Sequence, residues 1–110
     1  MAPLTTILFV DDEHDVGVVA DIALTRIGGF DVTVCASGHA ALDHLAEHQA
    51  DLVLLDVMMP GLDGPSTLER MRHDARTART PVAFVTAAHQ PRDLTRYRLL
   101  GVAGVIAKPF

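Results

Sequence analysis

A run of four apolar residues, Leu52-Val53-Leu54-Leu55, leads directly into a carboxylate, Asp56. Such a run is typical of a strand that is buried on both faces of a sheet. Pro60 and Gly61 follow closely and favour a loop over a continued strand. Asp56 is therefore predicted at the carboxyl end of a strand, where parallel α/β sheets carry their ligand sites. The alternative is that Asp56 is a structural residue that caps the next helix.

The rest of the chain alternates strand and helix patterns. Strands are predicted over 6–10, 31–36, 52–56 and 81–86, with a short fifth strand within 102–107. Helices are predicted over 15–27, after an N-cap at Ser37, from Gly64-Pro65 with the proline at the first helical position, and from Pro91 to Gly101. This alternation predicts one α/β domain with a doubly wound parallel sheet of flavodoxin-like order 2-1-3-4-5. No helix is predicted after the final strand.

Apolar residues at three- and four-residue steps indicate which side of each helix faces the core. The expected inward residues are Val16, Val19, Ala20, Ala23 and Ile27 in the first helix, Ala41, Leu42, Leu45 and Ala46 in the second, Leu68 and Met71 in the third, and Leu94, Tyr97 and Leu99 or Leu100 in the fourth.

The totals of the chain exclude several classes of protein. Its 110 residues suffice for one domain with its own core. A net charge of −5 and dispersed arginines argue against direct nucleic-acid binding, and no apolar run reaches the roughly 18–20 residues of a membrane span. The only cysteine, Cys35, is predicted to be a buried, inert thiol; with no signal peptide, this favours a cytoplasmic protein. His44 and His48 are interpreted as surface residues.

Two of the predicted strands end in acidic residues: Asp11-Asp12 after the first strand and Asp56 after the third. If these strands are neighbours, three carboxylates converge. Two such charges about 5 Å apart repel by roughly 3 kcal/mol at an effective dielectric constant of about 20. A cation or protonation must offset this repulsion, and carboxylate oxygens suit Mg²⁺ better than Zn²⁺. Glu13 has a simpler role as a negative charge near a helix N-terminus.

Two further strand ends carry a hydroxyl, Thr86, and an ammonium, Lys108. Lys108 is the only lysine beside eight arginines. A compact point charge that must reach a phosphoryl oxygen explains this choice, and a chance surface lysine is the alternative.

These features together resemble the receiver domain of bacterial two-component response regulators, over residues 1–110. The motifs that carry the resemblance are Asp11-Asp12, Asp56, Met59-Pro60-Gly61-Leu62-Asp63-Gly64, Thr86-Ala87 and Lys108-Pro109-Phe110. The resemblance implies a signalling domain rather than a conventional enzyme, although such domains catalyse their own aspartyl phosphorylation and dephosphorylation. The implied partner is a sensor histidine kinase or a histidine phosphotransfer protein.

The resemblance also implies a role for each matching residue. Asp56 would accept the phosphoryl group. Mg²⁺ would be held by Asp12, by Asp11 largely through water, by Asp56 and by the backbone carbonyl of Met58. Lys108 would pair with a phosphoryl oxygen, after a bond to Pro109 that is expected to be cis. Thr86 would move to hydrogen-bond the phosphate.

Two features depart from the family pattern. The position three residues before the lysine, usually Tyr or Phe, is Val105. Coupling must then pass through Thr86, the loop 87–90 and the helix that bears Tyr97. The family's usual final helix is also missing, so we expect a domain cut short before it, with an apolar face that is covered by missing residues, an exchanged element or a homodimer partner.

Three other protein classes are alternatives, and each requires particular residues in the sequence. An FMN module of the flavodoxin type needs a phosphate-binding turn after the first strand, where Asp11-Asp12 would repel phosphate. A haloacid-dehalogenase-type phosphatase needs an acid where Met58 stands. A receiver-like scaffold that binds partners without phosphorylation is the remaining alternative, because of Val105. Binding of acetyl phosphate or beryllofluoride with Mg²⁺ distinguishes it from a working receiver.

Overall fold

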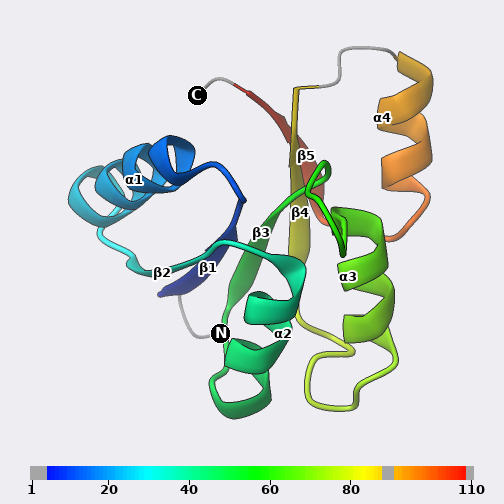
Figure 1. Cartoon of the computed structure of the whole chain (residues 1–110), viewed down its shortest axis with the longest axis horizontal. Coiled ribbons are helices and arrows are strands. Elements are labelled where there is room, and N and C mark those ends of the chain that lie inside the picture. The colour runs from blue at the N-terminus through cyan, green and yellow to red at the C-terminus, as the bar shows by residue number, and fades with distance from the viewer. Residues whose placement is uncertain (1–4, 88–90, 109–110) are drawn as a thin grey trace.

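The computed structural model describes residues 5–87 and 91–108 and contains one parallel sheet (Figure 1). Its strands are β1 (Thr6–Val10), β2 (Asp31–Cys35), β3 (Leu52–Asp56), β4 (Val82–Thr86) and β5 (Gly104–Ala107). The strand order is β2-β1-β3-β4-β5, and every neighbouring pair is parallel. The predicted flavodoxin-like order is therefore confirmed, and the strand bounds agree with prediction to within a residue or two.

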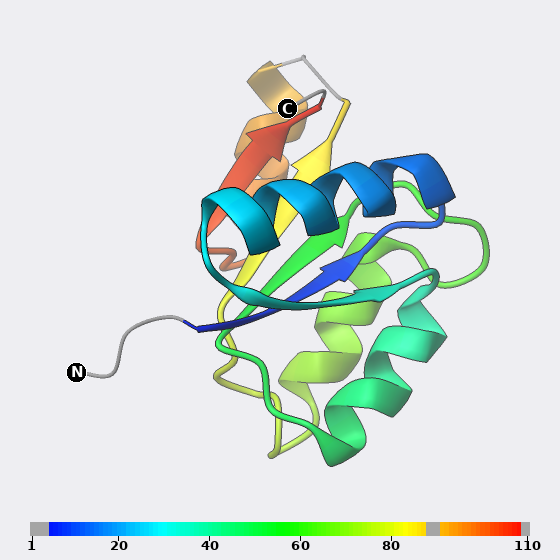
Figure 2. The same cartoon turned by 90° about the vertical axis from the view of Figure 1, so that its left-hand side faces the viewer.

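Helices cover both faces of this sheet unequally (Figures 1 and 2). They are α1 (His14–Ile22), continued by the π-helix η1 (Ala23–Ile27), then α2 (Gly38–Glu47), α3 (Gly64–Arg72) and α4 (Pro91–Arg98). Helices α2, α3 and α4 pack on one face, whereas α1 and η1 pack on the other. No helix follows β5 within the described residues. None of the described helices is long and apolar enough to cross a bilayer.

Alternation along each strand divides the core between these two faces. On the side of α2, α3 and α4, Leu8 and Leu55 pack with Leu45, Met71 and Phe84. On the side of α1, the buried apolar residues are fewer and smaller: Ile7, Phe9, Ala20, Leu54, Ala83 and Val85. The first cluster lies under three helices and the second under one, so the core is deeper on the α2–α4 side.

The predicted inward face of the first helix is only partly right. Val16, Ala20 and Leu24 contact the sheet, but Val19 is 51% exposed and Ile27 is 87% exposed. Val19 lies beside this stripe, on a flank that no other described helix covers. The chain then continues as η1, and its wider turn carries Ile27 away from the stripe.

The inward residues predicted at the end of the fourth helix are wrong. Helix α4 ends at Arg98, so Leu99 and Leu100 lie in the following turn and are 82% and 45% exposed. Tyr97 is buried as predicted and packs edge-on against Phe84, with ring centroids 5.6 Å apart.

Two smaller expectations also need correction. Helix α3 begins at Gly64, so Pro65 is its second residue rather than its first. Cys35 is only partly buried, and that burial raises the pKa of its thiol.

Candidate functional site

The carboxyl edge of the sheet gathers the polar side chains that the sequence placed at strand ends. Asp11 directly follows β1, Asp56 is the last residue of β3, and Thr86 is the last residue of β4. All three residues are buried, at 2%, 3% and 1% exposure, among strands that are otherwise apolar at this edge. Lys108 directly follows β5, and its backbone N–H donates to the carbonyl of Thr86 at 2.9 Å.

Three carboxylates converge at this edge. Oxygen atoms of Asp11, Asp12 and Asp56 lie within 4.8 Å of one another. Val10 and Leu55 are partners in the register of β1 and β3, so the residues that follow them, Asp11 and Asp56, leave the sheet side by side. Asp12 is exposed and closes the cluster on the solvent side, which leaves an open path for an ion.

Lys108 is the cation of the site. Its Nζ lies 2.7 Å from Oδ2 of Asp11 and 3.3 Å from Oδ1 of Asp56. Glu13 Oε1 lies at the outer limit of an ion pair, 4.0 Å away. One ammonium faces three clustered carboxylates, so the ionised cluster keeps a net charge of −2 (−3 + 1) before Glu13 is counted. This excess favours a further cation.

The environment changes the acidity of both partners. Burial raises the pKa of Asp56 to about 6; the Asp11 carboxylate adds to the rise, whereas Lys108 and a backbone hydrogen bond from Met58 oppose it. For Lys108, burial alone would lower the pKa, but the hydrogen bond to Asp11 and the charges of Asp56 and Asp11 outweigh it and raise the pKa. At neutral pH Asp56 is therefore mostly an ionised carboxylate and Lys108 an ammonium.

The loop after β3 returns closely over Asp56. Gly64 N–H donates to the carbonyl of Val57 at 3.0 Å, and Asp63 caps α3 by accepting from Ser66 N–H at 2.8 Å. A Cβ on Gly64 would lie 2.5 Å from the carbonyl oxygen of Asp56, so no larger residue fits without movement. Glycine at this position keeps the loop close to the strand end, a constraint the sequence motif alone did not explain.

The donor set fits a hard divalent cation. Oδ1 of Asp11 accepts from Glu13 N–H at 2.9 Å, while the buried Oδ2 faces the Lys108 ammonium at 2.7 Å and no other partner among the described residues. Oxygen donors with an exposed side suit Mg²⁺, which keeps several of its waters. Asp11, Asp12 and Asp56 are thus the residues that could hold it.

Most of the predicted site residues are brought together. Asp11, Asp12, Asp56 and Lys108 share one cluster, and Thr86 is bonded to Lys108 through the backbone. Met58 has an exposed side chain, and its carbonyl as a metal ligand stays a prediction. Pro109 and residues 88–90 lie outside the described residues, so the expected cis bond and loop movement also stay predictions.

Two contributions were missed at the level of sequence. Glu13 was assigned only to the start of α1; it does stand at the N-cap of that helix, but it also approaches Lys108. Val105 pairs with Phe84 in the β4–β5 register and packs against the core that contains Tyr97. The sequence placed Val105 correctly but gave no sign of the Phe84–Tyr97 contact, which depends on how α4 packs.

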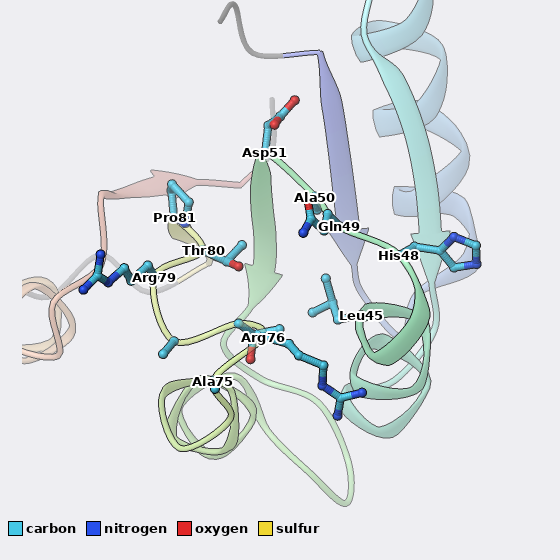
Figure 3. A pocket seen from close by; sticks show the side chains of 12 residues that line it. Leu45, His48, Gln49, Ala50, Asp51, Ala75, Arg76, Arg79, Thr80 and Pro81 are labelled. Carbon is cyan, nitrogen blue, oxygen red and sulfur yellow. The ribbon is translucent and has the colours of Figure 1, made fainter. Parts of the chain in front are cut away.

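A larger hollow of about 550 Å³ opens at the opposite, amino-terminal edge of the sheet (Figure 3). Arg76 lines it, but this side chain is already engaged: it pairs with Asp74 at 2.8 Å and donates to the carbonyl of Ala46 at 3.0 Å. Among the described residues that line it, Asp51 is the one acid, and it accepts hydrogen bonds from Thr5 and Thr6. This hollow gathers no set of free acids and is not a competing candidate for the site.

Comparison with known proteins gives a consistent result. Residues 7–110 match the family model described as the response regulator receiver domain. Response regulator Rre1 of Synechocystis is 36% identical over the whole chain, which spans 48% of that relative. The transcriptional regulatory protein CseB of Streptomyces coelicolor is 34% identical, also over the whole chain and 45% of the relative. The chain thus spans about half the length of these curated relatives.

Solved structures agree with the fold. The chemotaxis protein CheY4 of Vibrio cholerae superposes with a TM-score of 0.88 at 25% identity, over 98% of this chain and 89% of the other. The N-terminal domain of a response regulator receiver protein from Methanoculleus marisnigri superposes with a TM-score of 0.85 at 36% identity, over 97% and 86%.

Proposed function

This chain belongs to the response regulator receiver domain family, and from that membership we propose that Asp56 accepts a phosphoryl group from the phosphohistidine of a sensor kinase or of a histidine phosphotransfer protein. The observation that carries the proposal is the contact of Lys108 with the ionised cluster: a buried carboxylate, Asp56, with a cation 3.3 Å away and two further acids within 4.8 Å. A structural capping residue would need none of these neighbours.

The transfer depends on position and charge more than on covalent assistance. An oxygen of Asp56 attacks phosphorus, the bond between phosphorus and the donor imidazole nitrogen breaks, and the imidazole leaves with the bonding electron pair. Lys108 lies where it can pair with an oxygen of the incoming group. Mg²⁺ held by Asp11, Asp12 and Asp56 would neutralise the remaining negative charge. At neutral pH, a nucleophile whose pKa is about 6 is mostly ionised and ready to react.

The output of the domain is a change of conformation. The buried Thr86 hydroxyl stands at the end of β4, beside the site, and would hydrogen-bond the new phosphate. Phe84, two residues earlier on β4, packs on Tyr97 of α4. With valine at position 105, the path from the site to α4 runs through β4 and this aromatic contact. The signal is proposed to pass to an attached output domain or to a separate partner protein. The first option agrees with the relatives, of which this chain spans about half.

The test is phosphorylation by a small donor. With acetyl phosphate and Mg²⁺, intact-protein mass spectrometry should show one added phosphoryl group that is stable to acid and labile to base. Asp56→Asn should abolish it, whereas Asp43→Asn, at an exposed acid of α2, should not. A phosphoryl group that persists in Asp56→Asn would place the acceptor elsewhere. If the unaltered chain is not phosphorylated and does not bind beryllofluoride, the better interpretation is a receiver-like scaffold that binds partners without phosphorylation.

Lys108 provides a second arm of the same test. Lys108→Arg keeps the charge but replaces a compact ammonium with a planar fork. Asp56 is unchanged in this variant, but we expect phosphorylated Lys108→Arg to fail to change conformation. The measurement is the spectral change that phosphorylation produces around Tyr97, which should be absent in the variant. Normal switching in that variant would show that only the charge of Lys108 matters.

A further inference from the structure

We propose that His44 and His48 form a binding site for a borderline divalent metal ion such as Ni²⁺ or Zn²⁺, separate from the acidic cluster around Asp56. Their four-residue spacing alone was interpreted as two surface side chains. The fold changes this interpretation, because it places both imidazoles together at a hollow on the opposite edge of the sheet.

The two rings are held as neighbours. Their centroids lie 4.7 Å apart, with an angle of 25° between the ring planes. The backbone fixes this spacing, because His48 N–H donates to the carbonyl of His44 at 2.9 Å at the end of α2. Buried Ala41 and Leu45 anchor the same helix to the core. The terminal torsion of histidine is broad, so a small rotation can turn the two rings from stacking toward one shared ion.

The surroundings favour a cation. A hollow of about 200 Å³ is lined by both histidines and by Asp31 at the start of β2, while Thr33 and Gln49 offer further oxygen atoms. None of the described residues that line it is an arginine or a lysine. Figure 3 shows the His48 side chain directed away from Arg76, so the guanidinium of the larger hollow does not face the ring.

The chemistry of the two donor sets separates this site from the acidic cluster. Imidazole nitrogens prefer Zn²⁺, Ni²⁺ and Cu²⁺, whereas carboxylate oxygens and water suit Mg²⁺. His44 and His48 supply two nitrogens, and the remaining positions of the ion are left to water; Asp31 also lines the same hollow. Since α2 runs from the Asp56 edge to the amino-terminal edge, both ions can be bound at once.

The test is a calorimetric titration of the folded chain with Ni²⁺. The protein carries no affinity tag, Mg²⁺ is kept saturating so that the acidic cluster is occupied, and Cys35→Ser removes the only thiol. We expect one saturable Ni²⁺ site. His44→Ala and His48→Ala should each weaken it by at least the roughly 10–100-fold that is typical for loss of a residue supporting a metal site. His39→Ala, at an exposed histidine of the same helix, is the matched control and should bind as before.

Thermal unfolding gives a second readout. A metal that binds only the folded chain raises its melting temperature, so Ni²⁺ should stabilise the parent protein and the His39→Ala variant but not the other two. Melting curves without metal show whether each variant is folded. The proposal is overturned if the parent shows no saturable site, or if His44→Ala and His48→Ala bind Ni²⁺ as tightly as the His39→Ala control.

Discussion

Asp51, an exposed carboxylate directly before β3, holds the first strand in place. Its Oδ2 accepts from the backbone N–H groups of Thr5 and Thr6, each at 2.9 Å, and from both hydroxyls. The hydrogen bond from the Thr6 backbone, followed by the others, lowers the pKa of Asp51 to about 2 from an ordinary 3.8. These bonds therefore favour the ionised carboxylate in the folded chain.

The pH dependence of stability follows from this shift. A depressed carboxyl pKa stabilises the fold above the unfolded value, and that contribution is lost as pH falls from about 4 to about 2. Wild type should melt at a higher temperature than Asp51→Asn at pH 6, and the difference should shrink toward pH 2. Asp43→Asn serves as the control, because this exposed acid has no comparable set of donors among residues 5–87 and 91–108. A difference that stays constant with pH would contradict the assignment.

Gly64 is a second residue whose role depends on close packing. A methyl group there would meet the carbonyl oxygen of Asp56 at 2.5 Å and the Cα of Val57 at 2.8 Å, and both atoms belong to the backbone. Gly64→Ala should therefore cost about 1–3 kcal/mol of unfolding free energy and weaken Mg²⁺ binding at Asp56. Gly104→Ala, where a Cβ would meet nothing within 4 Å, should change neither quantity. Denaturant unfolding and Mg²⁺ titration measure both effects.

At the scale of elements, the start of α2 depends on one side chain. Ser37 Oγ accepts from Ala40 N–H at 3.0 Å, as expected of an N-cap serine. Ser37→Ala should lower the unfolding free energy by about 1 kcal/mol. Ser66→Ala is the control, because at that position the backbone N–H makes the cap hydrogen bond to Asp63 and the side chain is not needed. If both variants lose the same unfolding free energy, the loss in Ser37→Ala does not come from its cap hydrogen bond.

The elements also show where sequence reasoning succeeds. Strand ends were predictable because buried apolar runs stop abruptly at residues such as Asp56 and Thr86, and parallel strands bring those ends to one edge. Helix faces were less predictable. Val19 and Leu99 have the right spacing, but whether a residue is covered depends on which neighbours exist in three dimensions. The Lys108–Asp11 contact likewise depends on the geometry of the whole sheet rather than on any local pattern.

At the scale of the whole molecule, the two faces of the sheet are unequally covered. On the α1 side, Val19 and Ile22 are 51% and 49% exposed, and Ile106 of β5 is 39% exposed. Stable monomers rarely carry contiguous apolar patches beyond about 300–600 Å². We expect the 110-residue chain by itself to associate as its concentration rises, which light scattering over a dilution series would show.

A pair of variants locates the contact. Val19→Ser combined with Ile106→Thr should reduce this association. Leu99→Ser removes an even more exposed apolar residue, a leucine beyond the end of α4 and on the opposite side of the sheet, and should leave the association unchanged. Scattering that indicates a monomer at every concentration, or equal effects of the two variants, would contradict the prediction.

The position of Lys108 has a consequence for metal binding. Its ammonium, 2.7 Å from Asp11, is a counter-ion that the protein carries covalently, so it cannot be diluted away from the carboxylates. A divalent ion must compete with this ammonium for the carboxylates. The effective concentration of the ammonium depends on its attachment next to β5 and not on the ion concentration of the solution. Lys108→Met should therefore bind Mg²⁺ more tightly than wild type while losing the pairing that a phosphoryl group needs. Under the proposed function, this weaker metal binding before phosphorylation would be offset by a cation that is already in place when the phosphoryl group arrives.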